Sequence, residues 1–200
     1  MATEIELKAH VRDSEDLRLL LTEKAEYINA FEKADTYWLP AVNHASISYA
    51  KSPAKIRVRR ETRTLPDGTV ESAALVTYKT KEVRDGIEIN DELEFEVSSG
   101  PAFEELLERM GFKPDASKRK KGWAFSKEGI TAELSEVGGN PGNDSSRSLG
   151  WFIELEILAD NSREETVAQG RQRLTSFLSG LGIEKEAIES RHYTEMLGEN

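Results

Sequence analysis

Residues 150–158 read Gly-Trp-Phe-Ile-Glu-Leu-Glu-Ile-Leu, so that two glutamates alternate with aliphatic residues. Successive side chains of a β-strand point to opposite faces of a sheet. Glu154 and Glu156 therefore share one face, while the isoleucine and leucine residues beside them share the other. This pattern predicts an amphipathic strand with one charged face and one apolar face.

The same alternation recurs along the chain, and within each segment the charged residues keep one parity. The other charged strand faces are Glu4, Glu6 and Lys8; Arg57 and Arg59, with Lys55 before them; Lys79 and Lys81; Glu92, Glu94 and Glu96; and Lys118 and Lys120. On one strand, such a face is most often solvated. Six such strands, with hardly a Ser, Thr or Asn on the charged faces, favour a closed barrel whose interior is charged and whose apolar outer face lies under helices. A barrel of about eight strands can hold one small ligand.

The remaining signals complete an α+β pattern. Strands are expected at residues 3–11, 26–39, 54–64, 70–81, 92–97, 118–126, 130–137 and 150–158, and helices from an N-cap at Ser14, from 101 to 111, from a capping box at 162–165 to about 181, and at about 184–197. Residues 138–148 are expected to form a loop. The short turns predict antiparallel pairing, and we expect one domain over residues 1–200: a closed antiparallel β-barrel of about eight strands with flanking helices.

Composition excludes several classes of function. The chain has 200 residues, 27 basic and 37 acidic side chains and a net charge of −10, which disfavours nucleic acid and anionic membranes as partners. It contains no cysteine, so disulfide scaffolds and thiolate metal sites are excluded. No apolar run approaches the roughly 20 residues of a membrane span, and the N-terminal residues lack a signal-peptide core. We expect a cytoplasmic protein.

A tunnel lined with both signs of charge suits a polyphosphate bound together with a metal ion. Arginine and lysine neutralise phosphate, and arginine offers a bidentate fork. Paired carboxylates bind Mg²⁺ or Mn²⁺, hard cations that also bridge to phosphate oxygens.

Seven short segments are informative together: 4–8 (Glu-Ile-Glu-Leu-Lys), 35–38 (Asp-Thr-Tyr-Trp), 56–59 (Ile-Arg-Val-Arg), 77–79 (Thr-Tyr-Lys), 92–97 (Glu-Leu-Glu-Phe-Glu-Val), 149–156 (Leu-Gly-Trp-Phe-Ile-Glu-Leu-Glu) and 192–197 (His-Tyr-Thr-Glu-Met-Leu). In this order they resemble the CYTH superfamily, the triphosphate tunnel metalloenzymes. The segment at 149–156 is the most specific match. The likeness covers nearly the whole chain.

This resemblance implies a tunnel in which a triphosphate is bound and converted with Mg²⁺ or Mn²⁺. By position, the metal-side carboxylates are Glu4, Glu6, Glu154 and Glu156. The groups that contact phosphate are Lys8, Arg57, Arg59, Lys79, Lys118 and Lys120, with Lys8 and Lys79 expected to be catalytic. Glu92 and Glu94 are expected to orient basic groups or to hold a second metal ion.

The chain departs from the family pattern at two places. Lys118-Arg119-Lys120 replaces the usual Lys-x-Arg, which removes one guanidinium fork. Leu134-Ser135-Glu136-Val137 replaces Leu-Asp-x-Val, and Ser135 lacks the charge of that metal-side aspartate. Glu133 lies on the same predicted face as Ser135 and is a substitute ligand. The number of metal ions stays open, as does the oligomeric state.

Three functions remain open. The first is hydrolysis of inorganic tripolyphosphate or of a nucleoside or organic triphosphate such as ATP or thiamine triphosphate. The second is a class IV adenylyl cyclase reaction, in which the ribose 3′-hydroxyl of ATP attacks to give cyclic AMP and diphosphate. The third is a sensor that binds polyphosphate or nucleotide without turnover. The sequence ranks hydrolysis first, because it needs no adenine pocket.

Overall fold

The computed structural model describes residues 3–41, 55–84, 87–142, 146–159 and 163–199, with the side chains of 79–92 outside that description. Strands in the described part are β1 (Thr3–Val11), β2 (Glu26–Pro40), β3 (Ile56–Thr64), β4 (Val70–Arg84), β5 (Ile87–Glu96), β6 (Phe112–Lys127), β7 (Ile130–Asn140) and β8 (Arg147–Ala159). The α-helices are α1 (Ser14–Lys24), α2 (Gly100–Arg109), α3 (Glu164–Gly180) and α4 (Tyr193–Gly198), and a 3₁₀ turn spans Lys185–Ala187.

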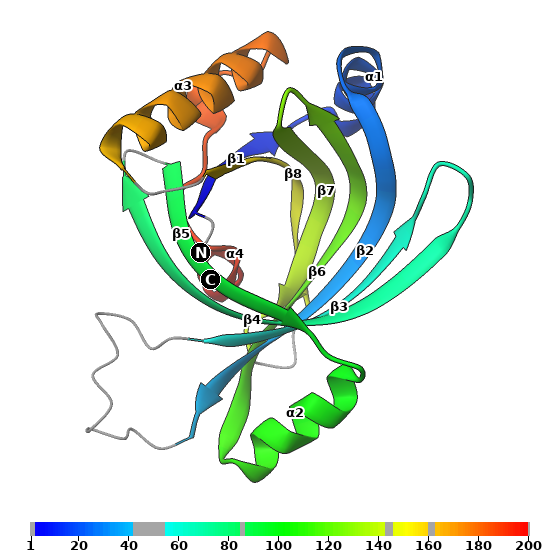
Figure 1. Cartoon of the computed structure of the whole chain (residues 1–200), viewed down its shortest axis with the longest axis vertical. Coiled ribbons are helices and arrows are strands. Elements are labelled where there is room, and N and C mark those ends of the chain that lie inside the picture. The colour runs from blue at the N-terminus through cyan, green and yellow to red at the C-terminus, as the bar shows by residue number, and fades with distance from the viewer. Residues whose placement is uncertain (1–2, 42–54, 85–86, 143–145, 160–162, 200) are drawn as a thin grey trace.

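Every strand pairing is antiparallel, as the short turns predict. The hydrogen-bonded order is β1-β5-β4-β3-β2-β6-β7-β8, and it returns to its start because β1 pairs with both β5 and β8. Figure 1 shows the strands curving around a common centre, with α4 inside the curve. The predicted α+β class and the eight antiparallel strands are confirmed.

Helix ends differ from the prediction, including those of α2, which spans Gly100–Arg109 instead of 101–111. The prediction of one continuous helix at 184–197 is wrong, because a 3₁₀ turn ends at Ala187 and α4 begins only at Tyr193. His192 and Glu195 start this new helix by bonding reciprocally to each other's backbone. The N-cap of α1 is Asp13 instead of Ser14, and its carboxylate accepts from the backbone N–H of Asp16 at 3.1 Å.

The predicted capping box at 162–165 begins at Ser162, which lies outside the described residues. The N-cap of α3 is Arg163, and its side chain makes no capping hydrogen bond. The expected loop at 138–148 is shorter than predicted, because Gly138 and Gly139 pair with Ser148 and Arg147 and extend both strands.

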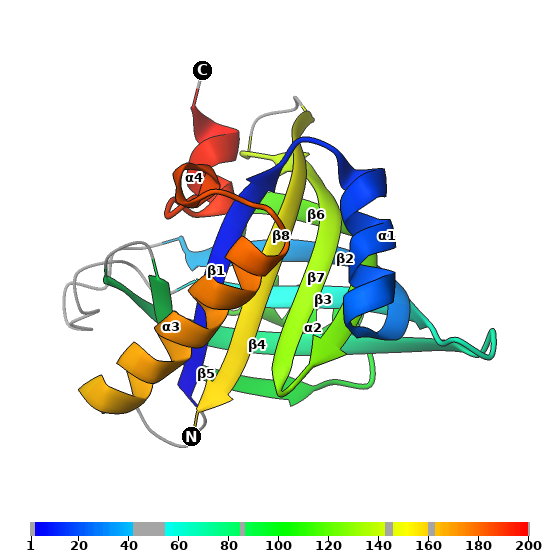
Figure 2. The same ribbon diagram turned by 90° about the horizontal axis from the view of Figure 1, so that it is seen from above.

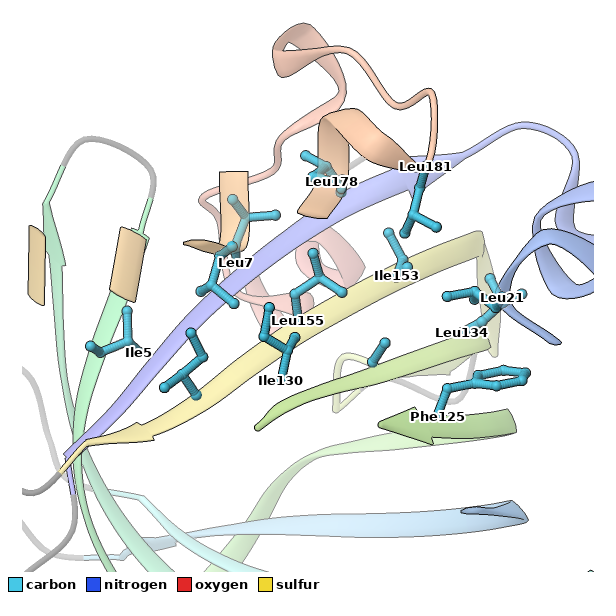
Figure 3. Close-up of a cluster of buried hydrophobic side chains, with 14 of the residues drawn as sticks. Ile5, Leu7, Leu21, Phe125, Ile130, Leu134, Ile153, Leu155, Leu178 and Leu181 are labelled. Carbon is cyan, nitrogen blue, oxygen red and sulfur yellow. The ribbon is translucent and has the colours of Figure 1, made fainter. Parts of the chain in front are cut away.

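The main hydrophobic core lies between the outer face of the sheet and helices α1 and α3. Figure 2 shows α3 lying along β1 and β8, and Figure 3 shows the side chains that fill the space between them. Ile5, Leu7, Ile153 and Leu155 have no exposed surface. Gly170 lets α3 approach β1 closely, because a Cβ there would lie 2.6 Å from Ile5 Cδ1. Burying these apolar faces is the main favourable term in folding.

The outer face is covered only in part, which corrects the expectation that helices hide all of it. Helix α2 packs Leu107 against Trp38 and Val58. Leu93 and Phe95 on β5 are 56% and 47% exposed, although the Phe95 ring lies 6.2 Å from the ring of Phe103 in α2. Among the described residues, no helix has both the length and the apolar character to cross a membrane.

Candidate functional site

Charged side chains gather on the side of the sheet opposite the core, which we call the concave face. Its strongly buried charged members are Lys8, Lys33, Asp35, Arg59, Glu61, Lys118, Lys120, Glu133 and Glu154. They come from β1, β2, β3, β6, β7 and β8. Buried charges need partners, and these side chains find them mainly in one another.

Three lysines of the concave face converge on one aromatic ring. The Nζ atoms of Lys8, Lys118 and Lys120 lie 4.7, 5.2 and 5.3 Å from the ring centroid of Tyr193. Tyr193 is the first residue of α4 and stacks edge-on against Phe152 of β8. Cations are attracted to the face of an aromatic ring, so Tyr193 relieves part of the lysine–lysine repulsion. Two of the three lysines also have a carboxylate beside them, Asp35 at Lys118 and Glu154 at Lys120.

Lys8 is also held by the segment before α4. Its ammonium donates to the carbonyl oxygen of Arg191 at 2.7 Å, and its own carbonyl accepts from the backbone N–H of Glu189. The guanidinium of Arg191 in turn donates to both carboxylate oxygens of Glu189. This lowers the pKa of Glu189 to about 2. Lys8, only 2% exposed, therefore has a fixed position.

Arg59 is fully engaged with a carboxylate that the sequence did not single out as a site residue. Its Nε and Nη2 donate to the two oxygens of Asp35 at 2.7 and 3.0 Å, and Lys118 Nζ lies 3.2 Å from Asp35 Oδ2. Burial alone would raise the pKa of Asp35, but the charges of Arg59 and Lys118 outweigh it and hold that pKa well below its usual range.

Arg57 occupies a more open position. Its Nη2 donates to Thr77 Oγ1 at 2.9 Å and to Glu94 Oε2 at 3.2 Å, and the Thr77 hydroxyl donates to the same carboxylate oxygen at 2.7 Å. The side chain of Arg57 is 15% exposed and that of Glu94 is 39% exposed. Glu94 thus contacts a basic group, the arrangement expected from the resemblance.

Two of the expected metal-side carboxylates form ion pairs with lysines. Glu154 contacts Lys120, and Glu133 Oε1 lies 2.5 Å from Lys33 Nζ. Burial would raise the pKa of both carboxyl groups, but the neighbouring ammonium groups outweigh burial and lower both pKa values. Each carboxylate is therefore charged, and each has a cation of the protein beside it.

The other expected metal-side carboxylates lie along β1 and β8. Glu4, Glu6 and Glu156 are half-buried, and Glu6 is directly opposite Glu156 in the β1–β8 register. Within the described part of the chain, no three acidic or histidine side chains are close enough to enclose a metal ion. Mg²⁺ commonly uses one or two carboxylates, water and substrate phosphate. Glu6 and Glu156, which are directly opposite each other, fit that mode of binding.

The side chains of two expected site residues, Lys79 and Glu92, are outside the described part of the structure. The backbones of Lys79 and Glu92 are directly opposite each other in the β4–β5 register. Their roles stay predictions.

Ser135 lies at a buried, closely packed position in the sheet. It has no exposed surface, and it lies between Gly122 of β6 and Phe152 of β8 in the register. Among the described residues its hydroxyl has no hydrogen-bond partner. A Cβ on Gly122 would lie 2.6 Å from Ser135 Cα, so the strands are too close here for a larger side chain on Gly122. Ser135 is thus enclosed between closely packed strands.

Sequence reasoning missed Lys33, Glu61 and Tyr193 as members of the site. Parity could have found the first two, because Lys33 shares the face of Asp35 and Glu61 shares the face of Arg57 and Arg59. Parity does not mark Tyr193, although it lies in the family-like segment 192–197, because its place over the lysines depends on how the C-terminal residues fold back.

A family model described as the CYTH domain matches residues 2–193. The chain belongs to the CYTH domain family. A curated relative from Methanocaldococcus jannaschii, named "Putative adenylate cyclase MJ0240", is 24% identical over 197 residues and covers 98% of both chains. The match to this family spans the strands and α4's first residue, so it includes the whole concave face.

Solved structures share the fold of this CYTH domain. The PH1819 protein of Pyrococcus horikoshii superposes with a TM-score of 0.76 at 24% identity, covering 97% of each chain. The PH1012 protein of the same organism gives 0.71 at 25% identity, covering 98% of this chain and 99% of that one. HpAC1 from Hippeastrum, described as having a dominant triphosphatase activity, gives 0.60 at 17% identity, covering 98% and 95%.

Proposed function

We propose that this CYTH domain is a divalent-metal-dependent triphosphatase whose concave face lines a tunnel for the triphosphate. The substrate is inorganic tripolyphosphate or a nucleoside or organic triphosphate such as ATP or thiamine triphosphate. Water attacks the terminal phosphorus and the bond to the bridging oxygen breaks, which releases phosphate and leaves the diphosphate.

One observation carries this proposal: the ammonium groups of Lys8, Lys118 and Lys120 lie within 5.3 Å of a single point. Asp35 and Glu154 compensate part of the charge of Lys118 and Lys120, and a bound polyanion would contact all three ammonium groups at once. Arg57, more exposed than Arg59, adds a guanidinium fork for a further phosphate.

The carboxylates Glu6 and Glu156 support metal use in the proposed reaction. Glu6 and Glu156 would hold a divalent cation, which would supply charge neutralisation at the transferring phosphoryl group. The protein's own part is to orient the phosphate chain through the three lysines and to neutralise the charge that builds on the leaving oxygen.

The comparisons support a triphosphate substrate without choosing the nucleophile. HpAC1 carries the description of a triphosphatase, whereas the M. jannaschii relative carries the name of an adenylate cyclase. The second candidate is therefore a class IV adenylyl cyclase, in which the 3′-hydroxyl of ATP attacks the α-phosphorus and diphosphate leaves. The same lysines would then bind the leaving diphosphate.

Product analysis separates the candidates. The protein is incubated with tripolyphosphate, ATP or thiamine triphosphate, each with Mg²⁺ or Mn²⁺, and the products are resolved by ion-exchange chromatography. Phosphate release supports the triphosphatase, and cyclic AMP with diphosphate supports the cyclase. Tight binding of all three compounds without any product would contradict both and leave a sensor.

A further inference from the structure

Two lysines and two glutamates, each from a different strand, form a quartet of charged side chains on the concave face. Glu133 of β7 is directly opposite Glu154 of β8, and Lys33 of β2 is directly opposite Lys120 of β6. Two carboxylates opposite each other repel, unless a cation lies between them or beside them. Such a pair is a usual place for a divalent metal ion.

The cations of the quartet come from the chain itself. Lys33 Nζ lies 2.5 Å from Glu133 Oε1, and Lys120 contacts Glu154. The two lysines therefore neutralise the two glutamates one to one, and the quartet has no net charge. A divalent cation added here would bring two positive charges next to two ammonium groups.

Lys33 is fixed in place by more than one partner. Its ammonium also lies 3.8 Å from Glu61 Oε1 and 4.4 Å from the ring centroid of Phe31. Both oxygens of Glu61 accept from Arg63 as well, at 2.8 and 3.1 Å. Lys33 is only 7% exposed, so a metal ion could reach Glu133 only by displacing a buried ammonium.

We propose that Lys33 is a built-in cation that occupies the position of a second metal ion, so that Glu133 and Glu154 bind no divalent metal while Lys33 is present. The inference refines the metal use of the proposed function and rests on it. Metal binding is then confined to the side of Glu6 and Glu156, and Glu133 holds Lys33 in position instead of acting as a ligand.

The test counts bound Mn²⁺ by isothermal titration calorimetry and by the loss of the free Mn²⁺ electron-resonance signal, with and without tripolyphosphate. Lys33→Met removes the cation at similar length. Lys121→Met is the matched control, because Lys121 lies on the outward side of β6 and its side chain is 76% exposed. We expect Lys33→Met to bind one more Mn²⁺ than the wild type, and the control to bind the same number. The added ion should disappear in Lys33→Met/Glu133→Gln.

Two results would overturn the inference. One is a Lys33→Met protein that folds, as judged by circular dichroism, and binds no additional Mn²⁺. The other is a loss of one Mn²⁺ when Glu133→Gln is made in the otherwise wild-type protein, which needs no folded Lys33 variant. Neither result depends on turnover. If the protein fails to hydrolyse triphosphates, the proposed function is contradicted, but the number of bound Mn²⁺ ions still tests the role of Lys33.

Discussion

Arg59 of β3 and Asp35 of β2 lie directly opposite each other and form a two-pronged ion pair, with N–O distances of 2.7 and 3.0 Å. Asp35 has no exposed side-chain surface, and Arg59 has 11%. The pKa of Asp35 is well below its usual range and that of Arg59 is well above. This pair therefore contributes to the fold, although sequence reasoning had assigned Arg59 to phosphate.

Replacing Arg59 should therefore destabilise the protein. Arg59→Ala leaves the buried Asp35 with Lys118 as its ion-pair partner, and breaking a buried pair in this way costs roughly 3–5 kcal/mol. Urea unfolding followed by circular dichroism measures the loss. Arg60→Ala, on the exposed side of the same strand, is the control and should change the free energy of unfolding little. Equal stability of the two variants would contradict the structural role.

Replacing Arg57 should instead weaken substrate binding. Arg57 is more open, and a charge-assisted hydrogen bond contributes about 1.5–3 kcal/mol. Arg57→Ala should lower kcat/KM for tripolyphosphate at least roughly tenfold, with a larger loss for a triphosphate than for a diphosphate. Steady-state kinetics on both substrates measure this, and an equal loss on both would argue against a phosphate contact.

Stability should fall in acid. The pKa values of Asp35, Glu133 and Glu154 are lowered in the folded protein, whereas carboxyl groups titrate near 4 in an unfolded chain. A lowered folded-state pKa gives stability that is complete above about pH 4 to 5 and is lost as the pH falls toward the folded-state values. The urea midpoint should be flat from pH 7 to 5 and decline below about 4. Glu154→Gln should show a shallower decline, and an unchanged slope would contradict this account.

Ser135 should tolerate loss of its hydroxyl. A buried hydroxyl without a partner is unfavourable, so Ser135→Ala should leave the free energy of unfolding unchanged or raise it by up to about 1 kcal/mol. The number of bound Mn²⁺ ions and the rate of turnover should also stay the same. A clear loss of metal affinity in this variant would show that the hydroxyl is a ligand after all.

The alternation of charged and apolar residues made the fold class predictable. Glu154 and Glu156 point to one side because Ile153 and Leu155 must be buried on the other, and this holds whatever the strand's neighbours are. The concave face as a charged surface follows from parity alone. The same parity would have included Lys33 and Glu61.

The partners of these charges could not be predicted in the same way. Glu154 and Lys120 are 34 residues apart, and they meet because β6, β7 and β8 are adjacent and curved. The pairing of Arg59 with Asp35 likewise depends on the register of β2 and β3. Tyr193 reaches the lysines only because the C-terminal residues return to the sheet after α3. Strand register and the return of the C-terminal residues to the sheet are set by tertiary structure. Neither can be predicted from the spacing of residues in the sequence.

Replacing Lys8 is the most direct test of the charged concave face, because the result distinguishes a buried lysine that binds ligand from a surface lysine that does not. Its ammonium contacts the carbonyl of Arg191 and faces the ring of Tyr193, close to Lys118 and Lys120. A triphosphate that binds these ammonium groups together with Mg²⁺ should stabilise the fold by about 2.7 kcal/mol at a hundredfold excess over Kd. For a chain of this size that corresponds to a rise in melting temperature of roughly 5–10 °C.

Lys8→Met keeps the length of the side chain and removes its charge, so most of this rise should disappear. Lys121→Met should keep the full rise, because Lys121 pairs with Glu32 on the outward side of the sheet. Thermal melting of the three proteins with and without tripolyphosphate and Mg²⁺ provides the comparison. If the wild type shows no shift at millimolar ligand, or if Lys8→Met shifts as much as the wild type, Lys8 does not bind the triphosphate and the concave face is not its site.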